Sequence, residues 1–244
     1  MSFNNDELTI LEKFNFIIQP VAVKFYAKEP DTIKRLNEKA AFCEMLKKAQ
    51  EGNAFYSDSG CHTCEAGPYV LGQAEVPEQF INGEFGAGLK VFQNELAASR
   101  IYNYIPRVKK HAVNYVAFSP VNKLNFSPDL LVITADTSQS EIILRAASYK
   151  TGKIWLSRSS PVMGCAWIFI YPYLTGEINY IITGLGHGMK RRKLFPEGMQ
   201  IISIPVDLLP SILDSLQDME WILPGYKPDG PEFIKNLLTK LGLN

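Results

Sequence analysis

The sequence lacks an apolar run long enough to cross a membrane. Its longest apolar stretch, residues 165–174, is far shorter than the roughly 20 residues that a membrane-spanning helix needs. The first residues contain Asp6, Glu7 and Glu12 and no apolar run that ends in a small-residue cleavage site, so they do not resemble a secretory signal. We therefore expect a cytoplasmic protein without a membrane partner.

The sequence also lacks an excess of charge of either sign. Its 25 Lys and Arg residues are balanced by 25 Asp and Glu residues, so no overall field would attract nucleic acid. No internal repeat, low-complexity segment or clear linker divides the 244 residues. A chain of this length can bury a sizeable core, and we expect a single domain over residues 1–244.

Familiar catalytic signatures are missing as well. The sequence contains no serine-centred nucleophile elbow, no HExxH zinc motif, no kinase signature and no Walker loop. No reaction follows from a motif, and the sequence alone does not decide whether the chain is an enzyme.

The hydrophobic pattern predicts an α/β (or α+β) fold, with a mixed sheet flanked by helices. Helices are expected over residues 6–17, 31–50, 91–102, 138–148, 162–174, 206–217 and 230–241. Strands are expected over residues 21–25, 54–57, 113–118, 128–134, 154–156, 178–183 and 199–204. The run at 128–134 is continuously apolar, which is typical of a strand covered on both faces.

The most informative residues are four cysteines, Cys43, Cys61, Cys64 and Cys165. In a reducing compartment, metal-ligand or redox roles are more common for cysteines than structural disulfides. Four thiolates are the number that completes one zinc site or holds one iron–sulfur cluster. Cys61 and Cys64 are separated by two residues, a spacing that lets both sulfurs of a turn reach one metal. The count predicts a single site if the fold brings Cys165 to the other three.

The spacing of these cysteines leaves four interpretations open. Zinc ribbons carry two close pairs and bacterial ferredoxins a tight group of three, and this sequence has neither. The thiols could hold an iron–sulfur cluster of the 4Fe-4S type, or a zinc ion with His62 as an alternative ligand. They could also form a redox dithiol, or simply be small buried apolar side chains.

A glycine-rich basic loop is the second candidate site. Three alternating glycines follow an expected strand, and four consecutive cations come directly after them. Glycine lets backbone amides approach a ligand closely, so the pattern predicts an anion-binding site, and a solvated surface turn is the alternative. The candidate ligand-binding residues are Gly184, Gly186, Gly188, Lys190, Arg191 and Arg192.

Several motifs along the chain resemble an uncharacterised family, domain of unknown function 169 (ArCR-type). They are Phe42-Cys43, Cys64-Glu-Ala-Gly, the apolar run that begins at Pro128, and Gly164-Cys165-Ala. The family is frequent in methanogens, which are archaea, and in other anaerobes, and it implies no established reaction. Cys43, Cys64 and Cys165 match positions where the resemblance leads us to expect family cysteines, and Cys61 is an addition. The anaerobic distribution favours an iron–sulfur cluster over zinc.

The sequence therefore predicts an iron–sulfur protein of anaerobic metabolism with a redox or small-molecule-binding role. Its core would be a three-cysteine site that Cys61, His62 or an outside ligand completes. The alternatives are a metal-free module that binds a small anionic ligand through the basic loop, and a structural zinc protein. The expected partners are a small anionic ligand or a redox partner protein, and the sequence leaves a homo-oligomer open.

Overall fold

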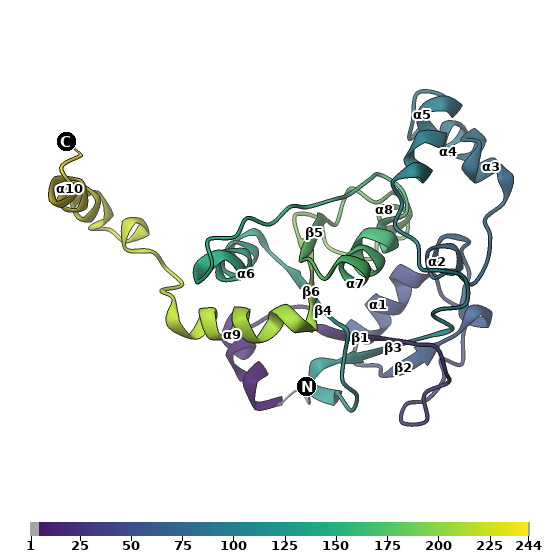
Figure 1. Cartoon of the computed structure of the whole chain (residues 1–244), viewed down its shortest axis with the longest axis horizontal. Helices are drawn as coiled ribbons and strands as arrows, with labels where there is room; N and C mark the ends of the chain where they lie inside the picture. Colours follow the sequence, from purple (N-terminus) through teal and green to yellow (C-terminus); the bar gives the residue numbers. More distant parts are fainter. Residues whose placement is uncertain (1–4, 244) are drawn as a thin grey trace.

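A computed structural model describes residues 5–243 and is organised around one six-stranded sheet (Figure 1). The strands lie in the order β2-β3-β1-β4-β6-β5, and every neighbouring pair is antiparallel. Their bounds are β1 Val21–Tyr26, β2 Phe55–Ser57, β3 Tyr115–Pro120, β4 Leu130–Ala135, β5 Asn179–Ile182 and β6 Gln200–Pro205. The expected combination of helices with a single sheet is confirmed.

The sheet is antiparallel where a mixed sheet was expected, and the segment after α6 (Thr137–Tyr149) explains the difference. Residues 154–156 were predicted as a strand that would follow α6, but they form no strand. Ile154 is 85% exposed, and Trp155 donates its indole N–H to the carbonyl of Leu144 at 3.1 Å. Packing against the helix therefore replaces strand pairing in residues 154–156.

Both faces of the sheet are covered. One face packs against α1 (Phe42–Gln50), α2 (Ala66–Val70) and the helix that contains the π-helical turn η5 (Ala166–Ile170) and α7 (Tyr171–Thr175). The other face packs against the 3₁₀ helix η1 (Asn5–Phe14), α6 and α9 (Leu209–Asp218). In β4, Leu130 and Val132 enter the first core, whereas Leu131 and Ile133 enter the second. This two-sided burial accounts for the continuous apolar run in the sequence.

Helix α1 is shorter than the predicted helix 31–50, because the first half of that segment pairs with neighbouring chain. The backbone of Leu36 donates to Tyr56, and that of Ala40 donates to Cys61. These hydrogen bonds occupy the groups that a helix would use. Helix α1 begins only after Ala41, whose backbone N–H donates to the Glu44 carboxylate at 2.6 Å.

The helix that follows Cys165 widens into a π-helical turn before α7. Pro172 lies in the first turn of α7, and a proline lacks the N–H that an α-helix requires and clashes with the carbonyl four residues earlier. The widened turn accommodates this residue, and π-helical turns are frequent at functional sites. The predicted buried helix 162–174 is confirmed in position, with this irregularity inside it.

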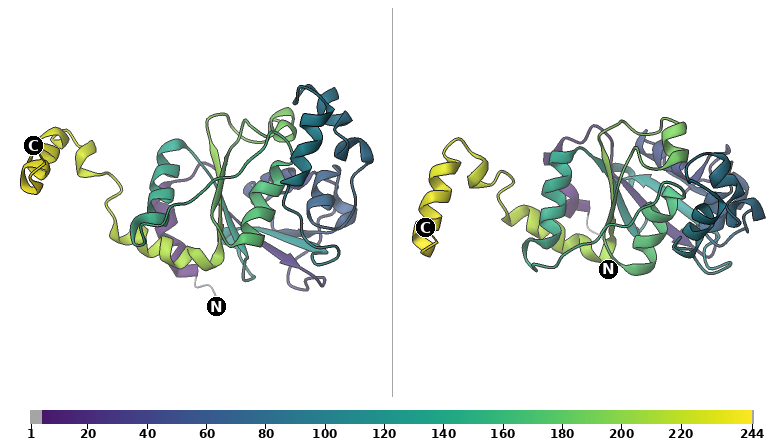
Figure 2. Two further views of the ribbon diagram at one scale, coloured as in Figure 1. Left: turned by 45° about the horizontal axis from the view of Figure 1, so that its top comes forward. Right: turned by 90° about the horizontal axis from the view of Figure 1, so that it is seen from above.

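Two groups of helices extend from the sheet and its covering layers. Three short helices, α3 (Glu78–Ile81), α4 (Glu84–Gly88) and α5 (Glu95–Arg100), pack on one another and on η3 (Ile101–Asn103) at one end of the molecule. At the other end, α10 (Gly230–Leu241) stands apart from the sheet, as Figure 2 shows. The remaining short helices are η2 Ser59–Cys61, η4 Val121–Lys123, η6 Val206–Leu208, η7 Pro224–Tyr226 and α8 His187–Arg191. Within residues 5–243, no helix combines the length and the apolar character that a membrane crossing requires.

A buried hydrogen bond ties α1 to the sheet and gives a test of this packing. The Gln50 amide donates to the Thr134 hydroxyl at 2.8 Å, and Thr134 is fully buried. Thr134→Val keeps the shape of the side chain and leaves the buried amide without its acceptor, so we expect it to lower the free energy of unfolding by about 1–3 kcal/mol. Urea denaturation measures this change, and Gln50→Leu combined with Thr134→Val should recover part of it. An unchanged denaturation midpoint in the single variant would contradict this account.

Candidate functional site

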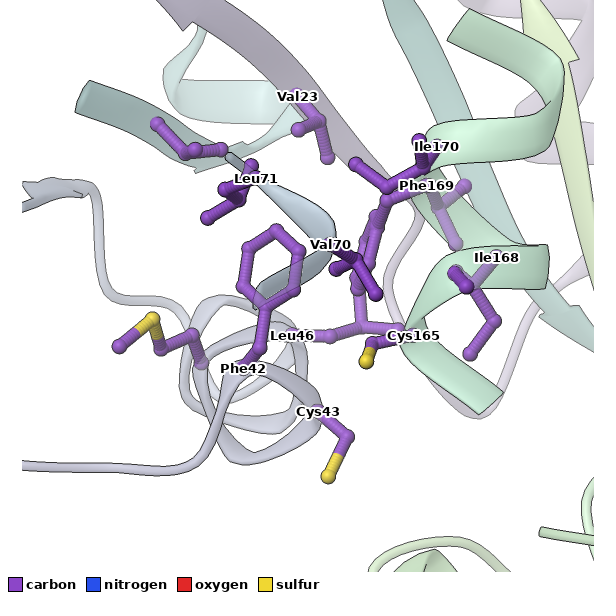
Figure 3. Close-up of a cluster of buried hydrophobic side chains, with 14 of the residues drawn as sticks. Val23, Phe42, Cys43, Leu46, Val70, Leu71, Cys165, Ile168, Phe169 and Ile170 are labelled. Carbon is purple, nitrogen blue, oxygen red and sulfur yellow. The ribbon is translucent and has the colours of Figure 1, made fainter. Parts of the chain in front are cut away.

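Three of the four cysteines come together on one side of the sheet. Cys43 lies in the first turn of α1, Cys64 lies between η2 and α2, and Cys165 directly precedes the π-helical turn. Figure 3 shows Cys43 and Cys165 on adjacent helices within the same apolar cluster. Cys43 and Cys165 are buried and Cys64 is partly exposed, and all three are free thiols.

The two buried thiols of this group have raised pKa values. Burial, followed by the charge of Cys64, raises the pKa of the Cys43 thiol to about 12. Burial raises the pKa of Cys165 well above its ordinary value, and Cys64 and Cys43 add to this effect. Two neighbouring thiolates in an apolar environment repel each other strongly, so Cys43 and Cys165 stay protonated unless a positive charge compensates. A metal centre is one source of that charge, since metal binding displaces thiol protons.

Cys61 lies in different surroundings. Its sulfur is 3.7 Å from the carbonyl oxygen of Leu36 and 3.4 Å from Oδ1 of Asp58, and Asp58 pairs with Arg35 at 2.6 Å. Burial raises the pKa of Cys61, and the nearest charges that act on it are those of Asp58 and Arg35. The structure thus brings Cys43, Cys64 and Cys165 together and packs the fourth predicted ligand against another part of the chain.

The donor atoms are not arranged around a single ion. Within the described part of the chain, no group of three or more His, Cys, Asp or Glu side chains is placed to hold one metal ion. A zinc site needs its cysteine sulfurs at about 2.3 Å from one point. A cluster binds each cysteine through a different iron, which spreads the sulfurs farther apart. The structural zinc site that the sequence left open is therefore not preformed among the described residues.

His62, the alternative ligand considered from the sequence, is packed into the protein. Both of its ring nitrogens are buried, and neither has a hydrogen-bond partner among the described residues. The ring contacts Phe42 edge-on at 5.8 Å, and burial lowers its pKa to about 4. A Cβ atom at Gly67 would lie 2.6 Å from Nδ1 of His62, so the ring fits only against a glycine.

A cavity of about 500 Å³ lies beside the three thiols and is bordered by Cys64. Thr63, Glu65 and Ala66 line it on the cysteine side, and His187, Gly188, Arg191 and Arg192 line it on the side of α8. Most of the remaining wall is apolar and comes from residues 80–102. Cys64 of the cysteine pair and the glycine-rich basic loop, two features singled out in the sequence, therefore meet at one cavity.

The basic loop divides into residues that face this cavity and residues that do not. Gly188, Arg191 and Arg192 line it, whereas Gly184 and Lys190 line a neighbouring hollow of about 380 Å³. Gly186 is buried, and a Cβ atom there would lie 2.4 Å from Cε of Met189. The end of the flexible Met189 side chain would have to move to admit a larger residue there.

Arg192 connects the loop to the thiols. Its Nε lies 3.2 Å from the Glu44 carboxylate on α1, and its Nη1 donates to the carbonyl of Gly188 at 3.1 Å. Its positive charge also partly offsets the effects that raise the pKa of Cys43. Glu44 caps the start of α1 with its other oxygen. One carboxylate thus holds together the helix that carries Cys43 and the loop that lines the cavity.

The apolar wall of the cavity was missed by sequence analysis. The wall is formed by Phe80, Phe85, Leu89, Phe92, Ile101 and Tyr102. The sequence does contain a signal for it, because Phe80, Phe85 and Phe92 recur at intervals of five and seven residues.

Comparison with known proteins identifies one family. A sequence model of the family described as uncharacterised ArCR, domain of unknown function 169, matches residues 9–215. This range includes all six strands and all four cysteines and excludes α10. The resemblance inferred from the motifs is confirmed. Neither the curated proteins nor the solved structures contain a match.

The difference in exposure among the cysteines predicts their reactivity. Cys64 borders the cavity, whereas Cys43, Cys61 and Cys165 are buried and their pKa values are raised. In metal-free protein, we expect one thiol to react rapidly with Ellman's reagent and the other three to react slowly. Cys64→Ser should remove the rapid phase, and a rapid phase that persists in this variant would contradict the placement of Cys64.

The surroundings of Cys61 predict a dependence of stability on pH. The hydrogen bond from Arg35 holds the pKa of Asp58 at about 2. Because this value is lowered in the folded state, the stabilisation is present above the ordinary carboxyl pKa and is lost as the pH falls towards 2. We expect Asp58→Asn to lower the free energy of unfolding at pH 7 by up to about 1 kcal/mol, since Arg35 is well exposed.

Urea denaturation at several pH values measures the effect of Asp58→Asn. The difference from the parent protein should shrink towards zero as the pH approaches 2. Glu197→Gln is the control, because Glu197 is exposed and has no recorded ion pair in the described part of the chain. A difference that stays constant across the pH range would contradict the predicted role of the carboxylate.

Proposed function

We propose that this chain, which belongs to the family of uncharacterised ArCR proteins, binds an iron–sulfur cluster through Cys43, Cys64 and Cys165. The observation that supports this proposal is the placement of three free thiols from three separate elements, close enough that the charge of Cys64 acts on Cys43 and that both act on Cys165. Buried thiols are common singly as small apolar side chains. Three that gather from separate elements, with Cys64 at the edge of a cavity, are better explained as a ligand set.

The electrostatics of the group favour a cationic centre. As thiolates, the three sulfurs would repel one another in surroundings that stabilise charge poorly, and iron ions would remove this penalty. The charge of Arg192 already acts in the same direction on Cys43. A cluster accepts cysteines on separate irons, which agrees with a donor set that is not centred on one point. Free thiols also suit a reducing compartment such as the cytoplasm.

Three cysteines are one fewer than the four that complete an ordinary cluster. A cluster held in this way supplies electron transfer or Lewis-acid chemistry, and Cys64 is the ligand that borders the cavity. The chain's own residues would position it: α1 and the π-helical turn hold the two buried ligands, and Glu44 fixes α1 to α8 through Arg192. This arrangement supports a redox or small-molecule role for the site in anaerobic metabolism.

The proposal is tested by reconstituting the full chain with iron and sulfide in the absence of oxygen. We expect iron and sulfide to bind in equal amounts, with an absorbance band from thiolate-to-iron charge transfer. Cys43→Ser, Cys64→Ser and Cys165→Ser should each lower the bound iron several-fold, because each removes one of three ligands.

The matched control is Cys61→Ser, which removes a buried cysteine that lies in other surroundings and should keep the iron. Circular dichroism of each metal-free variant separates loss of iron from loss of folding. The proposal is wrong if the parent protein binds no iron, or if folded Cys61→Ser loses as much iron as the other three variants.

A further inference from the structure

We propose that the cavity beside Cys64 binds a small amphipathic anion, with its negative group at α8 and its apolar body against residues 80–102. This goes beyond cluster binding, because it assigns a ligand site to side chains that the thiols do not need. The cavity volume of about 500 Å³ lies within the range of small-molecule sites.

The polar end of the cavity carries two side chains, Arg191 and His187, that are free to meet a ligand. Arg191 and His187 line both this cavity and the neighbouring hollow, so they lie where the two meet. No side-chain hydrogen bond or ion pair of either residue is recorded within residues 5–243. Arg192, in contrast, is held by Glu44 and by the carbonyl of Gly188. Arg191 therefore has its full set of donors available, and a guanidinium binds carboxylate or phosphate through two parallel hydrogen bonds.

The opposite end of the cavity is apolar and aromatic. Phe80 and Phe85 stack with ring centroids 4.3 Å apart, and Phe85 remains 46% exposed although it lines the cavity. Leu89 is 36% exposed, and Phe92 and Tyr102 complete the wall. Exposed aromatic side chains gathered in a concave site gain free energy when an apolar ligand covers them. An inorganic anion alone would leave this surface uncovered.

The charge at the cavity selects an anion over a cation. The lining includes two arginines and one histidine but only one carboxylate, that of the exposed Glu65. Glu44 neutralises part of the charge of Arg192, yet Arg191 still leaves the α8 side positive. A cationic amphiphile of equal length would meet the same apolar wall and be repelled at this end. The inferred ligand class is thus a carboxylate or phosphate ester with an aliphatic or aromatic body.

The probes for this site are octanoate, 2-naphthoate and octylammonium, measured by isothermal titration calorimetry on the full chain with and without reconstituted iron. We expect at least one of the two carboxylates to bind. Octylammonium should bind about tenfold more weakly than octanoate, because it exchanges an attractive charge for a repulsive one. Inorganic phosphate, which lacks an apolar body, should bind more weakly than the carboxylates.

Substitutions at exposed positions separate the two ends of the site without endangering the fold. Arg191→Gln should weaken carboxylate binding by about 10- to 100-fold, since a charge-assisted hydrogen bond is lost, and should strengthen octylammonium binding, because a repulsive charge is removed. Phe85→Ala should weaken every amphipathic probe. Lys193→Gln removes an exposed cation two positions from Arg191 that does not line the cavity, and it should change nothing.

The outcomes distinguish this inference from the cluster proposal. Carboxylate binding that persists in Cys165→Ser, which should lack iron, supports the ligand site on its own. The inference is overturned if neither carboxylate binds in either form of the protein, or if Arg191→Gln and Lys193→Gln bind octanoate equally well. Iron bound normally with no carboxylate bound would overturn the ligand site alone. Carboxylate bound with no iron would overturn the cluster alone.

Discussion

The site depends on one aromatic contact in the core. Phe42, the first residue of α1, packs against Phe169 with ring centroids 4.5 Å apart, and both rings contact Phe118 of β3 at 5.8 Å. Cys43 follows Phe42 directly, and Cys165 precedes Phe169 by about one helical turn. The burial of three phenylalanines therefore sets the relative position of two thiols that are 122 residues apart in the sequence. The approach of these two thiols is therefore a consequence of hydrophobic packing.

The sequence was most informative where local pattern and tertiary structure agree. The strands at 21–25, 113–118 and 128–134 have apolar patterns that suit a sheet covered on both faces, and the structure contains them. The predicted helix over residues 31–50 was wrong in its first half, where backbone groups of distant residues form the hydrogen bonds that a helix would use. Residues 31–41 have helical spacing, but Leu36 and Ala40 pair with residues near the cysteine loop. These hydrogen bonds depend on residues that are distant in sequence and fold beside the segment. The spacing of apolar residues within the segment does not predict them.

The candidate site, like the fold, could be predicted from the sequence only in part. The family resemblance separated Cys43, Cys64 and Cys165 from Cys61, and the structure makes the same division. This division could not be predicted from the two-residue spacing between Cys61 and Cys64, because the direction of each side chain depends on how residues 58–66 pack. Three alternating glycines predicted ligand contact along the loop, but only Gly188 borders the cavity. At Gly186 a larger side chain would meet the methyl group of Met189, a contact that only packing reveals.

The sheet also separates two kinds of constraint on the sequence. The core under η1, α6 and α9 contains none of the thiols and none of the cavity residues, whereas the core on the opposite face supports all of them. Side chains on opposite faces of a sheet with well-packed strands act on stability almost independently when they share no partner. The protein can thus gain or lose stability through one half of its interior while the chemistry of the other half stays fixed. Substitutions in the core under η1, α6 and α9 can therefore change thermal stability without altering the thiols or the cavity.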